Sequence, residues 1–508
     1  MGGVIRSKVA RVLSGALIGF DGALLEVEAD MKAGLPGLQI VGMGNKAIDE
    51  ARQRVRSAIT NSLLDFPARK ITVNLAPAEL PKDGTHLDLP IALSLLVASG
   101  QLKQSEVNDA LFAGELALDG SLRSIRGAVL LAELAHASGA KRLFLPVQNV
   151  QQATLVPGID IVGVATLKGL YRGLRGFEAF EEVMPSASSA TPLSTPSLIT
   201  FDSIVGHEQA KRALVIAAAG RHNILLSGSP GAGKTLLVKS LQSILPDLTD
   251  TEVVEVTKLY SLVSGDSNLV HRSPPFRAPH HGITLPALVG GGLRPRPGDI
   301  SLAHKGVLFL DELPEYPRAT LEALRQPLED RRVQLSRLYE HITYPADFLL
   351  AATMNPCPCG YLGDSKVSCT CSMSQIEMYK RKISGPLLDR IDLRLTVSKV
   401  HHEHFFDTKT LNNSQHYKVL ELVLIARKAQ AARYNRSNFY NAHASMKDAR
   451  ELFNIQDDAR LLLDKASTKL NLSSRGYLRV LRVARTIADI EMASEIEEKH
   501  IAEALQFR

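Results

Sequence analysis

The segment Gly228-Ser-Pro-Gly-Ala-Gly-Lys-Thr235 fits the phosphate-loop pattern G-x-x-x-x-G-K-S/T. An apolar run over 223–227 precedes it and a helical pattern over 235–244 follows it, which is the context this motif requires. Its glycines let backbone N–H groups curve around a phosphate, Lys234 reaches the β- and γ-phosphate oxygens, and Thr235 can hold Mg²⁺. The pattern predicts an ATP and Mg²⁺ site contacted by Gly228, Ser229, Pro230, Gly231, Ala232, Gly233, Lys234 and Thr235.

Polar residues also follow two further apolar runs. Asp311 and Glu312 come directly after 307–310, where one carboxylate can bind Mg²⁺ and the next can polarise an attacking water. Asn355 follows 348–352, and its amide could orient the same water or the γ-phosphate. Taken singly, an acidic pair or an Asn-Pro step is equally an ordinary turn. With the phosphate loop upstream, we predict Asp311 as a Mg²⁺ ligand and Glu312 and Asn355 as catalytic residues.

All four cysteines fall within fifteen residues, as C-x-C, nine residues and C-x-C: Cys357, Cys359, Cys369 and Cys371. Four thiolates can enclose Zn²⁺ tetrahedrally and stabilise a loop rich in Gly and Ser, with no open position for catalysis. Free or redox-active thiols and disulfides remain alternatives, since C-x-C is tighter than the usual C-x₂-C spacing. Because no disulfide framework is spread along the chain, a reducing cytoplasm is the expected compartment.

The elements that must position these residues divide the chain into about three domains, as 508 residues suggest. Residues 184–200 are rich in Pro, Ser and Thr and predict an exposed linker. Residues 1–183 alternate short β-rich runs with helical stretches, with a hairpin over 116–125, and predict a mixed α/β domain. Residues 201–400 predict a parallel sheet covered by helices, and residues 401–508 predict an all-helical unit.

Composition limits the classes of protein but does not identify a partner. With 45% hydrophobic residues the chain can bury real cores, which excludes disorder over its whole length. No stretch approaches the roughly 18 uncharged apolar residues of a membrane span. The net charge of +6 is compatible with a polyanion without demonstrating one. Two basic inserts are candidate DNA contacts that could instead be merely solvated; they carry Arg294 and Arg296, and Arg331, Arg332 and Arg337.

The order of phosphate loop, acidic strand end, polar strand end and helical lid resembles that of AAA+ ATPases. The stretches 201–214, Phe276-Arg-Ala-Pro-His-His281, 297–304 and 383–392 are similar to the magnesium-chelatase-like branch, and nearly the whole chain resembles the bacterial YifB/ComM family. The resemblance implies a homo-hexameric, ATP-driven DNA motor, a helicase promoting branch migration during recombination in natural transformation. The alternatives are an ATPase subunit of a tetrapyrrole metal chelatase and a non-helicase AAA+ regulator.

The resemblance also assigns residues outside the phosphate loop. Arg390 matches the arginine finger that reaches a neighbouring subunit's γ-phosphate, although an ion pair with Asp389 or Asp392 is an alternative. In the lid, Arg475 matches sensor 2, a nucleotide-contacting arginine, with Arg479 as the second choice. Both belong to a row of arginines spaced four, three and three apart on one helix face, and such faces are usually solvated. Val205 and Gly206 match the stretch that packs against adenine.

In the N-terminal half, 76–93 and Gly114-Glu-Leu-Ala-Leu-Asp-Gly120 resemble Lon-type proteases, which implies a fold of the ribosomal S5 domain 2 type. Lon-type chemistry needs a serine nucleophile and a lysine base. Alignment puts His86 at the serine position and Val129 at the lysine position. Both chemical groups are therefore missing, and the domain is expected to serve binding or assembly rather than proteolysis.

Overall fold

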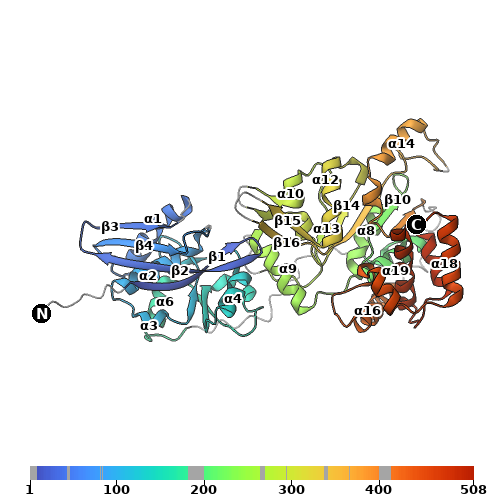
Figure 1. The fold of residues 1–508 in the computed structure, drawn as a ribbon. Coiled ribbons are helices and arrows are strands. Elements are labelled where there is room, and N and C mark those ends of the chain that lie inside the picture. Colours follow the sequence, from blue (N-terminus) through green and yellow to red (C-terminus); the bar gives the residue numbers. More distant parts are fainter. Residues whose placement is uncertain are drawn as a thin grey trace.

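The computed structural model describes residues 9–42, 46–80, 82, 84–180, 199–263, 269–292, 295–336, 341–364, 366–399 and 414–508. Figure 1 shows an N-terminal α/β body, a central body built on a second sheet, and a C-terminal group of helices. The expected linker over 184–200 falls almost entirely outside the described residues. No helix of the described segments is both long and apolar enough to cross a membrane.

The N-terminal domain is built on a seven-stranded mixed sheet in the order β3-β4-β2-β1-β5-β8-β9. Strand β2 pairs antiparallel with β1 and β4, whereas β1, β5, β8 and β9 run parallel. The strands span Ala10–Ile18 (β1), Asp21–Lys32 (β2), Gly37–Val41 (β3), Lys70–Ala76 (β4), Ala110–Phe112 (β5), Arg142–Pro146 (β8) and Asp160–Val164 (β9). The mixed α/β prediction is confirmed.

Helices α1 (Lys46–Asn61), α2 (Asp88–Ala98), α4 (Ala128–Ala137) and α6 (Leu167–Leu174) complete this domain. Helix α2 is apolar all round and buried over almost its whole length, as expected of a helix covered on every side. The hairpin of β6 (Glu115–Leu116) and β7 (Leu122–Arg123) turns at Asp119-Gly120, as predicted. His86 is buried with its Nε2 2.8 Å from the carbonyl oxygen of Gly15, and Val129 is buried in α4.

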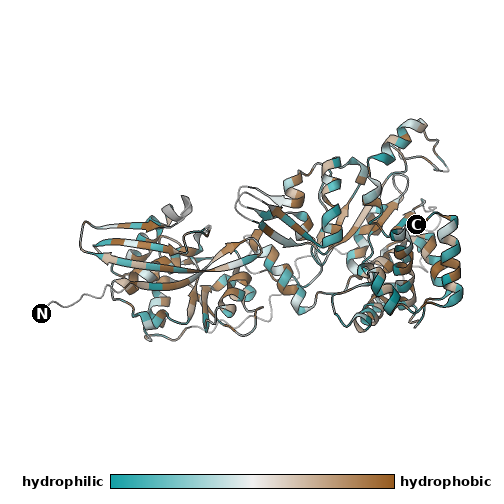
Figure 2. Cartoon of the chain, viewed as in Figure 1, coloured by the Kyte–Doolittle hydropathy of each residue, from teal (hydrophilic) through white to brown (hydrophobic). Residues whose placement is uncertain are grey.

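The central domain has five parallel strands in the order β11-β14-β17-β10-β18. They span Phe276–Arg277 (β11), Val307–Leu310 (β14), Leu349–Met354 (β17), Ile224–Ser227 (β10) and Leu393–Thr396 (β18). Alternate residues enter different cores: Phe309 packs with the cluster around α7 (Glu208–Gly220) and α8 (Lys234–Leu241), whereas Leu308 packs with that around α10–α13. Figure 2 shows the hydrophobic residues along these strands. The predicted parallel sheet is confirmed.

Helices α10 (Leu285–Val289), α11 (Asp299–Leu302), α12 (Arg318–Ala323) and α13 (Arg325–Asp330) belong to the second of these faces. The lid contains α16 (Ser414–Tyr434), α17 (Met446–Leu452), α18 (Asp457–Lys469), α19 (Ser474–Ile490) and α20 (Glu498–Gln506). Its apolar residues share one core with the α7 and α8 face of the sheet. The predicted helical unit is therefore present and is packed onto the central domain.

The alternative that the arginine face of α19 is merely solvated does not hold beyond its first turn. Arg479 donates to the carbonyl oxygen of Ile391 (3.2 Å), and Arg482 donates to that of Ala444 (2.7 Å). The Arg485 side chain is buried and pairs with Asp489. Arg479 thus bonds across to the central domain, whereas Arg482 and Arg485 satisfy oxygens within the lid, and these partners take the place of water.

The N-terminal and central domains meet at α9 (Asp250–Val263) and at the hairpin of β15 (Arg332–Ser336) and β16 (His341–Pro345). The Lys258 ammonium on α9 pairs with Glu133 on α4, and the backbone N–H of Gly127 donates to the carbonyl oxygen of Ser261 (3.2 Å). Ile342 of β16 lies against Gly19, because a Cβ added to Gly19 would be 2.3 Å from Cγ2 of Ile342. The contact is thus made by side chains and backbone on both elements.

Candidate nucleotide site

The phosphate loop connects the carboxyl end of β10 to the first turn of α8. Gly231 and Gly233 both have φ of 77°, a left-handed conformation that glycine adopts without strain. At Gly228 a Cβ would lie 2.3 Å from the carbonyl oxygen of Val397, so only glycine lets the loop pass the end of β18. The glycines therefore occupy positions where the backbone requires them, and the helix N-terminus opens at the loop as predicted.

The Lys234 ammonium lies inside this loop. Its Nζ donates to the carbonyl oxygens of Gly228 (2.7 Å) and Ser229 (3.0 Å), and to Oδ1 of Asn355 (3.2 Å). Burial lowers the pKa of Lys234, while the charges of Asp311 and Glu312 act in the opposite direction. The structure thus brings Asn355, from the end of β17, to the lysine of the phosphate loop.

The two carboxylates follow β14, beside the end of β17. Thr235 Oγ1 donates to Oδ2 of Asp311 (3.1 Å), so the two candidate Mg²⁺ ligands are in contact. Glu312 is exposed and has φ of 53°, which turns the chain sharply after the strand. The structure therefore gathers the three predicted strand ends at one edge of the sheet.

Thr353 was not singled out from the sequence, and it connects these groups. Its hydroxyl donates to Oδ1 of Asp311 and accepts the backbone N–H of Glu312 (3.1 Å). The side chain is fully buried. The sequence signal for Thr353 is a hydroxyl side chain inside an otherwise apolar strand. Thr353 comes one residue after Ala352, and Ala352 pairs with Leu310, the residue before Asp311. From inside the sheet, Thr353 thus holds the Asp311 carboxylate and the backbone turn from which the Glu312 side chain projects.

A cavity of about 490 Å³ opens beside the loop. It is lined by Val205 from the predicted adenine-contacting stretch, by most of the phosphate loop, by Leu236 of α8 and by residues that follow β17 and β18. Gly206, next to Val205, has φ of 70°. Pro230 lies against the chain that follows β17, because a Cβ added to Gly360 would be 2.6 Å from Cδ of Pro230. The cavity thus lies between Val205, which is predicted to contact adenine, and the first part of the phosphate loop, and Lys234 and Thr235 are not among its lining residues.

Arg390 and Arg475 lie at the opposite edge of the sheet. Arg390 precedes β18, and Asn223, just before β10, donates its Nδ2 to the carbonyl oxygen of Arg390 (2.8 Å). The Arg390 guanidinium pairs with Glu329 of α13 rather than with Asp389 or Asp392. Arg475, at the start of α19, is exposed and lies 3.8 Å from the same glutamate. Neither arginine lines the nucleotide cavity of its own chain.

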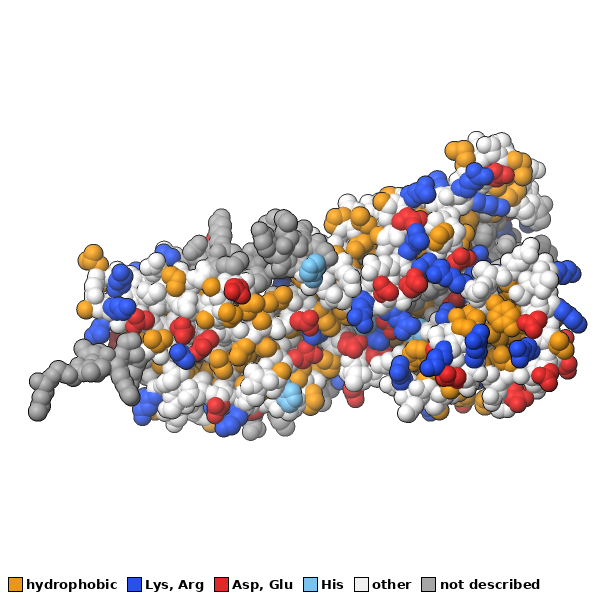
Figure 3. Space-filling view, viewed as in Figure 1, with side chains coloured by type: hydrophobic (Ala, Val, Ile, Leu, Met, Phe, Trp, Pro, Cys, Tyr) orange, Lys and Arg blue, Asp and Glu red, His pale blue; other side chains and the backbone are white. Residues whose placement is uncertain are grey.

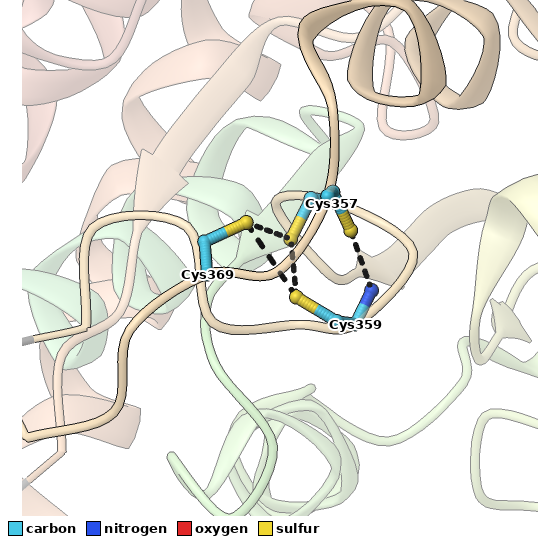
Figure 4. Close-up of side chains that lie close together, drawn as sticks. Cys357, Cys359 and Cys369 are labelled. Carbon is cyan, nitrogen blue, oxygen red and sulfur yellow. Dashed lines mark hydrogen bonds between the residues drawn. The ribbon is translucent and has the colours of Figure 1, made fainter.

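The four cysteine thiols converge in the loop that follows β17 (Figure 4). Their Sγ atoms all lie within 4.8 Å of one another, and Cys357 Sγ is 3.4 Å from Cys359 and 3.6 Å from Cys369. All four are free thiols, so the disulfide alternative is not present. Four thiolates at about 2.3 Å from a tetrahedral zinc ion are about 3.8 Å apart, so the separations fit a metal site. Backbone N–H groups of Tyr361 and Thr370 lower the pKa of Cys359 to about 5.

The candidate DNA contacts are dispersed. Arg296 is exposed on β13 (Arg296–Pro297), which pairs with β12 (Gly290–Gly291), so the Gly-rich insert forms a short antiparallel ladder. Arg332 is exposed at the base of the β15–β16 hairpin. The Arg331 guanidinium instead lies over the ring of Phe439 in the lid, 6.0 Å from its centroid. Arg294 and Arg337 are outside the described residues. On the face in Figure 3, Lys and Arg side chains gather over the central domain and lid.

A buried charged cluster, also not anticipated, joins the lid to the central domain around Asp347. Its carboxylate lies 3.0 Å from the Lys305 ammonium and 3.9 Å from the Arg221 guanidinium. Burial alone would raise the pKa of Asp347, but these cations lower it well below its usual range. His443 of the lid lies 3.7 Å away, and burial lowers its pKa well below 6.5. The cluster is part of the lid contact rather than of the nucleotide cavity.

Three family profiles match successive parts of the chain. The profile described as magnesium chelatase, subunit ChlI, matches 200–405 and contains the nucleotide site. Subunit ChlI of Mg-chelatase matches 27–149, and the magnesium chelatase subunit ChlI C-terminal profile matches 413–508. The matches therefore extend over the N-terminal domain, the central domain and the lid.

Curated relatives match over nearly the full length. The chain is 42% identical to the competence protein ComM of Haemophilus influenzae, covering 98% of this chain and 97% of that protein. It is 41% identical to the protein YifB of Escherichia coli, covering 97% and 96%. The magnesium-chelatase 38 kDa subunit of Rhodobacter capsulatus is 26% identical over 35% of this chain and 55% of that subunit. The chain belongs to the ComM/YifB family of magnesium-chelatase-like AAA+ proteins.

Proposed function

We propose that the chain is an ATP-driven DNA motor, a helicase that promotes branch migration during recombination in natural transformation. The observation that carries this proposal is the 42% identity to a protein named for competence, over 98% of this chain and together with a complete phosphate-loop site. Magnesium-chelatase subunits match only about a third of the chain, at 26–27% identity. The DNA motor is therefore preferred to the chelatase subunit and to a non-helicase regulator.

Within the site, each residue has a chemical task. The backbone of residues 228–235 and the Lys234 ammonium bind the phosphates. Thr235 and Asp311 supply hard oxygen ligands 3.1 Å apart, which fit Mg²⁺; the bound ion would neutralise charge on the phosphate oxygens. Glu312 takes the proton of the attacking water, and Asn355 orients that water or the γ-phosphate. The mechanism is hydrolysis by positioning and charge stabilisation, without a covalent intermediate.

A single chain does not complete this site. Each four-residue strand of the sheet spans about 13 Å, so Arg390 and Arg475, at the amino edge, lie far from the phosphate loop at the carboxyl edge. A neighbouring copy that places its amino edge against this loop would supply both arginines in trans, and planar cations at that position accelerate phosphoryl transfer by several powers of ten. Closing such head-to-tail contacts gives a ring, which we take to be a homo-hexamer.

The remaining assignments follow from the same proposal. Arg296 and Arg332, with Arg294 and Arg337, would contact DNA phosphates in a sequence-independent, salt-sensitive manner. The four cysteines would hold a structural Zn²⁺. Free clustered thiols favour a cytoplasmic location.

Two assays test the function. Strand displacement on a three-stranded junction and on a forked duplex, with ATP and salt varied, should show ATP-dependent unwinding. ATPase activity should rise with DNA and not with porphyrin plus chelatase partner subunits; the opposite response would support the chelatase function. Arg296→Ala should weaken DNA binding and reduce, by about 1, the slope of the logarithm of DNA affinity against the logarithm of salt concentration. Its free energy of unfolding should change by less than about 0.5 kcal/mol.

A further inference from the structure

The loop that carries the cysteines also forms one side of the nucleotide cavity. This cysteine loop, residues 356–371, starts directly after Asn355. The two thiol pairs stand at its two ends, and the chain between them contributes Leu362, Gly363, Asp364 and Lys366 to the cavity lining. The described part of this segment has no helix or strand of its own. The position of the loop therefore depends on whatever holds the two thiol pairs together and on a few contacts made by the residues between them.

Asp364 makes most of those contacts. Its side chain is 4% exposed, and its carboxylate accepts the Lys399 ammonium (2.9 Å) and the backbone N–H groups of Lys366 (2.9 Å) and Val367 (3.2 Å). The Lys399 ammonium, first among these groups, and the Ser229 hydroxyl of the phosphate loop help to hold the pKa of Asp364 well below its usual range. On the other side of the loop, Gly360 lies against the ring of Pro230. The tip is thus attached to the phosphate loop and to the chain after β18.

An apolar side chain of the same tip faces the cavity. Leu362 is 38% exposed and lines it together with Val205 and Leu236, itself 42% exposed. Exposed leucines beside a phosphate loop offer the flat apolar contact that a purine ring requires. The charged residues Asp364, Lys366 and Lys399 also line the cavity, and Asp364 and Lys399 pair with each other. This end of the cavity suits the base rather than the phosphates.

We propose that the cysteine loop is a metal-dependent wall of the nucleotide pocket, in which Zn²⁺ held by the four thiolates keeps Leu362 against the base and so raises nucleotide affinity. The physical reason is preorganisation. When Zn²⁺ holds the two thiol pairs together, the nine-residue span between Cys359 and Cys369 is ordered before the nucleotide arrives. Without the metal, the nucleotide must order this span when it binds, and that entropy cost weakens binding. The inference rests on the proposed ATP site and is independent of DNA binding.

The test uses the full chain and no DNA. Zinc content is measured first, with one Zn²⁺ per chain expected. The Kd for a fluorescent ADP analogue with Mg²⁺ is then measured on the purified protein, after removal of zinc by a chelator that binds zinc far more tightly than magnesium, and after zinc is returned. Removal should weaken binding at least tenfold, and Zn²⁺ should restore it. A stripped protein that binds nucleotide with unchanged affinity, or a chain that takes up no zinc, would overturn the proposal.

Variants distinguish the contribution of the Leu362 contact from that of zinc binding by the cysteines. Cys369→Ser with Cys371→Ser should lose both zinc and affinity, and if that protein does not fold, the strip-and-return experiment on the wild type decides. Leu362→Ala should keep zinc and lose affinity several-fold, whereas Met378→Ala, an exposed apolar residue of α14 (Met373–Arg381), should change neither. Equal affinity for Leu362→Ala and wild type contradicts the base contact. Lys234→Ala is the reference: if it binds nucleotide normally, the proposed ATP site itself is wrong.

Discussion

Thr353 joins the Asp311 carboxylate to the backbone of Glu312 in the candidate nucleotide site, and its replacement by valine tests that geometry. The variant keeps the shape of the side chain and removes only the hydroxyl, which donates to Asp311 and accepts the N–H of Glu312. Because Thr353 is fully buried, no water can enter to replace that hydroxyl. Asp311 is then free to rotate away from Thr235, and the turn that aims Glu312 loses its support.

The expected magnitude follows from these two hydrogen bonds. A hydrogen bond to a charged group contributes about 1.5–3 kcal/mol, and an unpaired buried N–H costs about 1–3 kcal/mol. Asp311 is only half-buried and regains part of its loss from solvent, so we expect Thr353→Val to be about 2–3 kcal/mol less stable. Supporting partners of metal ligands typically contribute 10–100-fold, and kcat should fall by about that factor. Nucleotide affinity should change little, since Lys234 and the loop backbone are untouched.

The assay compares kcat, its Mg²⁺ dependence and the denaturation midpoint. Thr353→Ser restores the hydroxyl and should return kcat to within about threefold of wild type, a difference of about 0.65 kcal/mol. Thr320→Val, at a buried threonine of α12, controls for the loss of any buried hydroxyl. If Thr353→Val hydrolyses ATP at the wild-type rate with an unchanged Mg²⁺ requirement, Thr353 does not position the carboxylates and the reasoning is refuted.

Three further variants probe the site and the lid. Glu312→Gln should bind ATP but stall, because it keeps the Mg²⁺ ligand and removes the base; wild-type turnover would contradict that role. Arg390→Ala should bind ATP without hydrolysing it, and mixing it with Lys234→Ala should recover some activity, whereas no recovery at any ratio argues for action in cis. His443 is neutral in the fold because burial lowers its pKa, but the unfolded chain protonates it below about 6.5. The free energy of unfolding should therefore fall as pH is lowered from 7 to 5.5, by up to about 1.4 kcal/mol per pH unit, and His443→Gln should flatten this dependence.

The strand ends of the nucleotide site could be predicted because their signals are local. Each consists of a short apolar run followed at once by glycine, carboxylate or amide, and parallel strands bring such ends to one edge of a sheet. The strand predicted over 223–227 is observed as Ile224–Ser227, and Asp311 and Asn355 lie where the pattern placed them. Thr353 escaped notice because its role depends on its neighbour across the sheet, and no spacing within one strand encodes that pairing.

The arginines show why charge patterns are harder to interpret. Spacing correctly put Arg479, Arg482 and Arg485 on one face of α19. Arg485 pairs with Asp489 one turn further along the helix, but Arg479 and Arg482 donate to the carbonyl oxygens of Ile391 and Ala444, which are distant in the sequence. Arg390 pairs with a glutamate 61 residues away in the sequence rather than with the aspartates beside it. The groups around a cation are set by the tertiary structure. The spacing of arginines along a sequence therefore predicts which of them share a helix face, but not which groups cover that face.

The same distinction explains the cysteine loop. The C-x-C pairs predicted that four thiols would meet, and they lie within 4.8 Å of one another. Their relation to the nucleotide depends on two contacts with no sequence signature, the Lys399 ammonium on Asp364 and Gly360 against Pro230. Both join the loop to segments that follow or precede other strands of the sheet, so the loop can lie against the phosphate loop only after β10, β17 and β18 have assembled. A structural metal between the two thiol pairs would then act on a surface that already contains the strand ends that we propose to be catalytic.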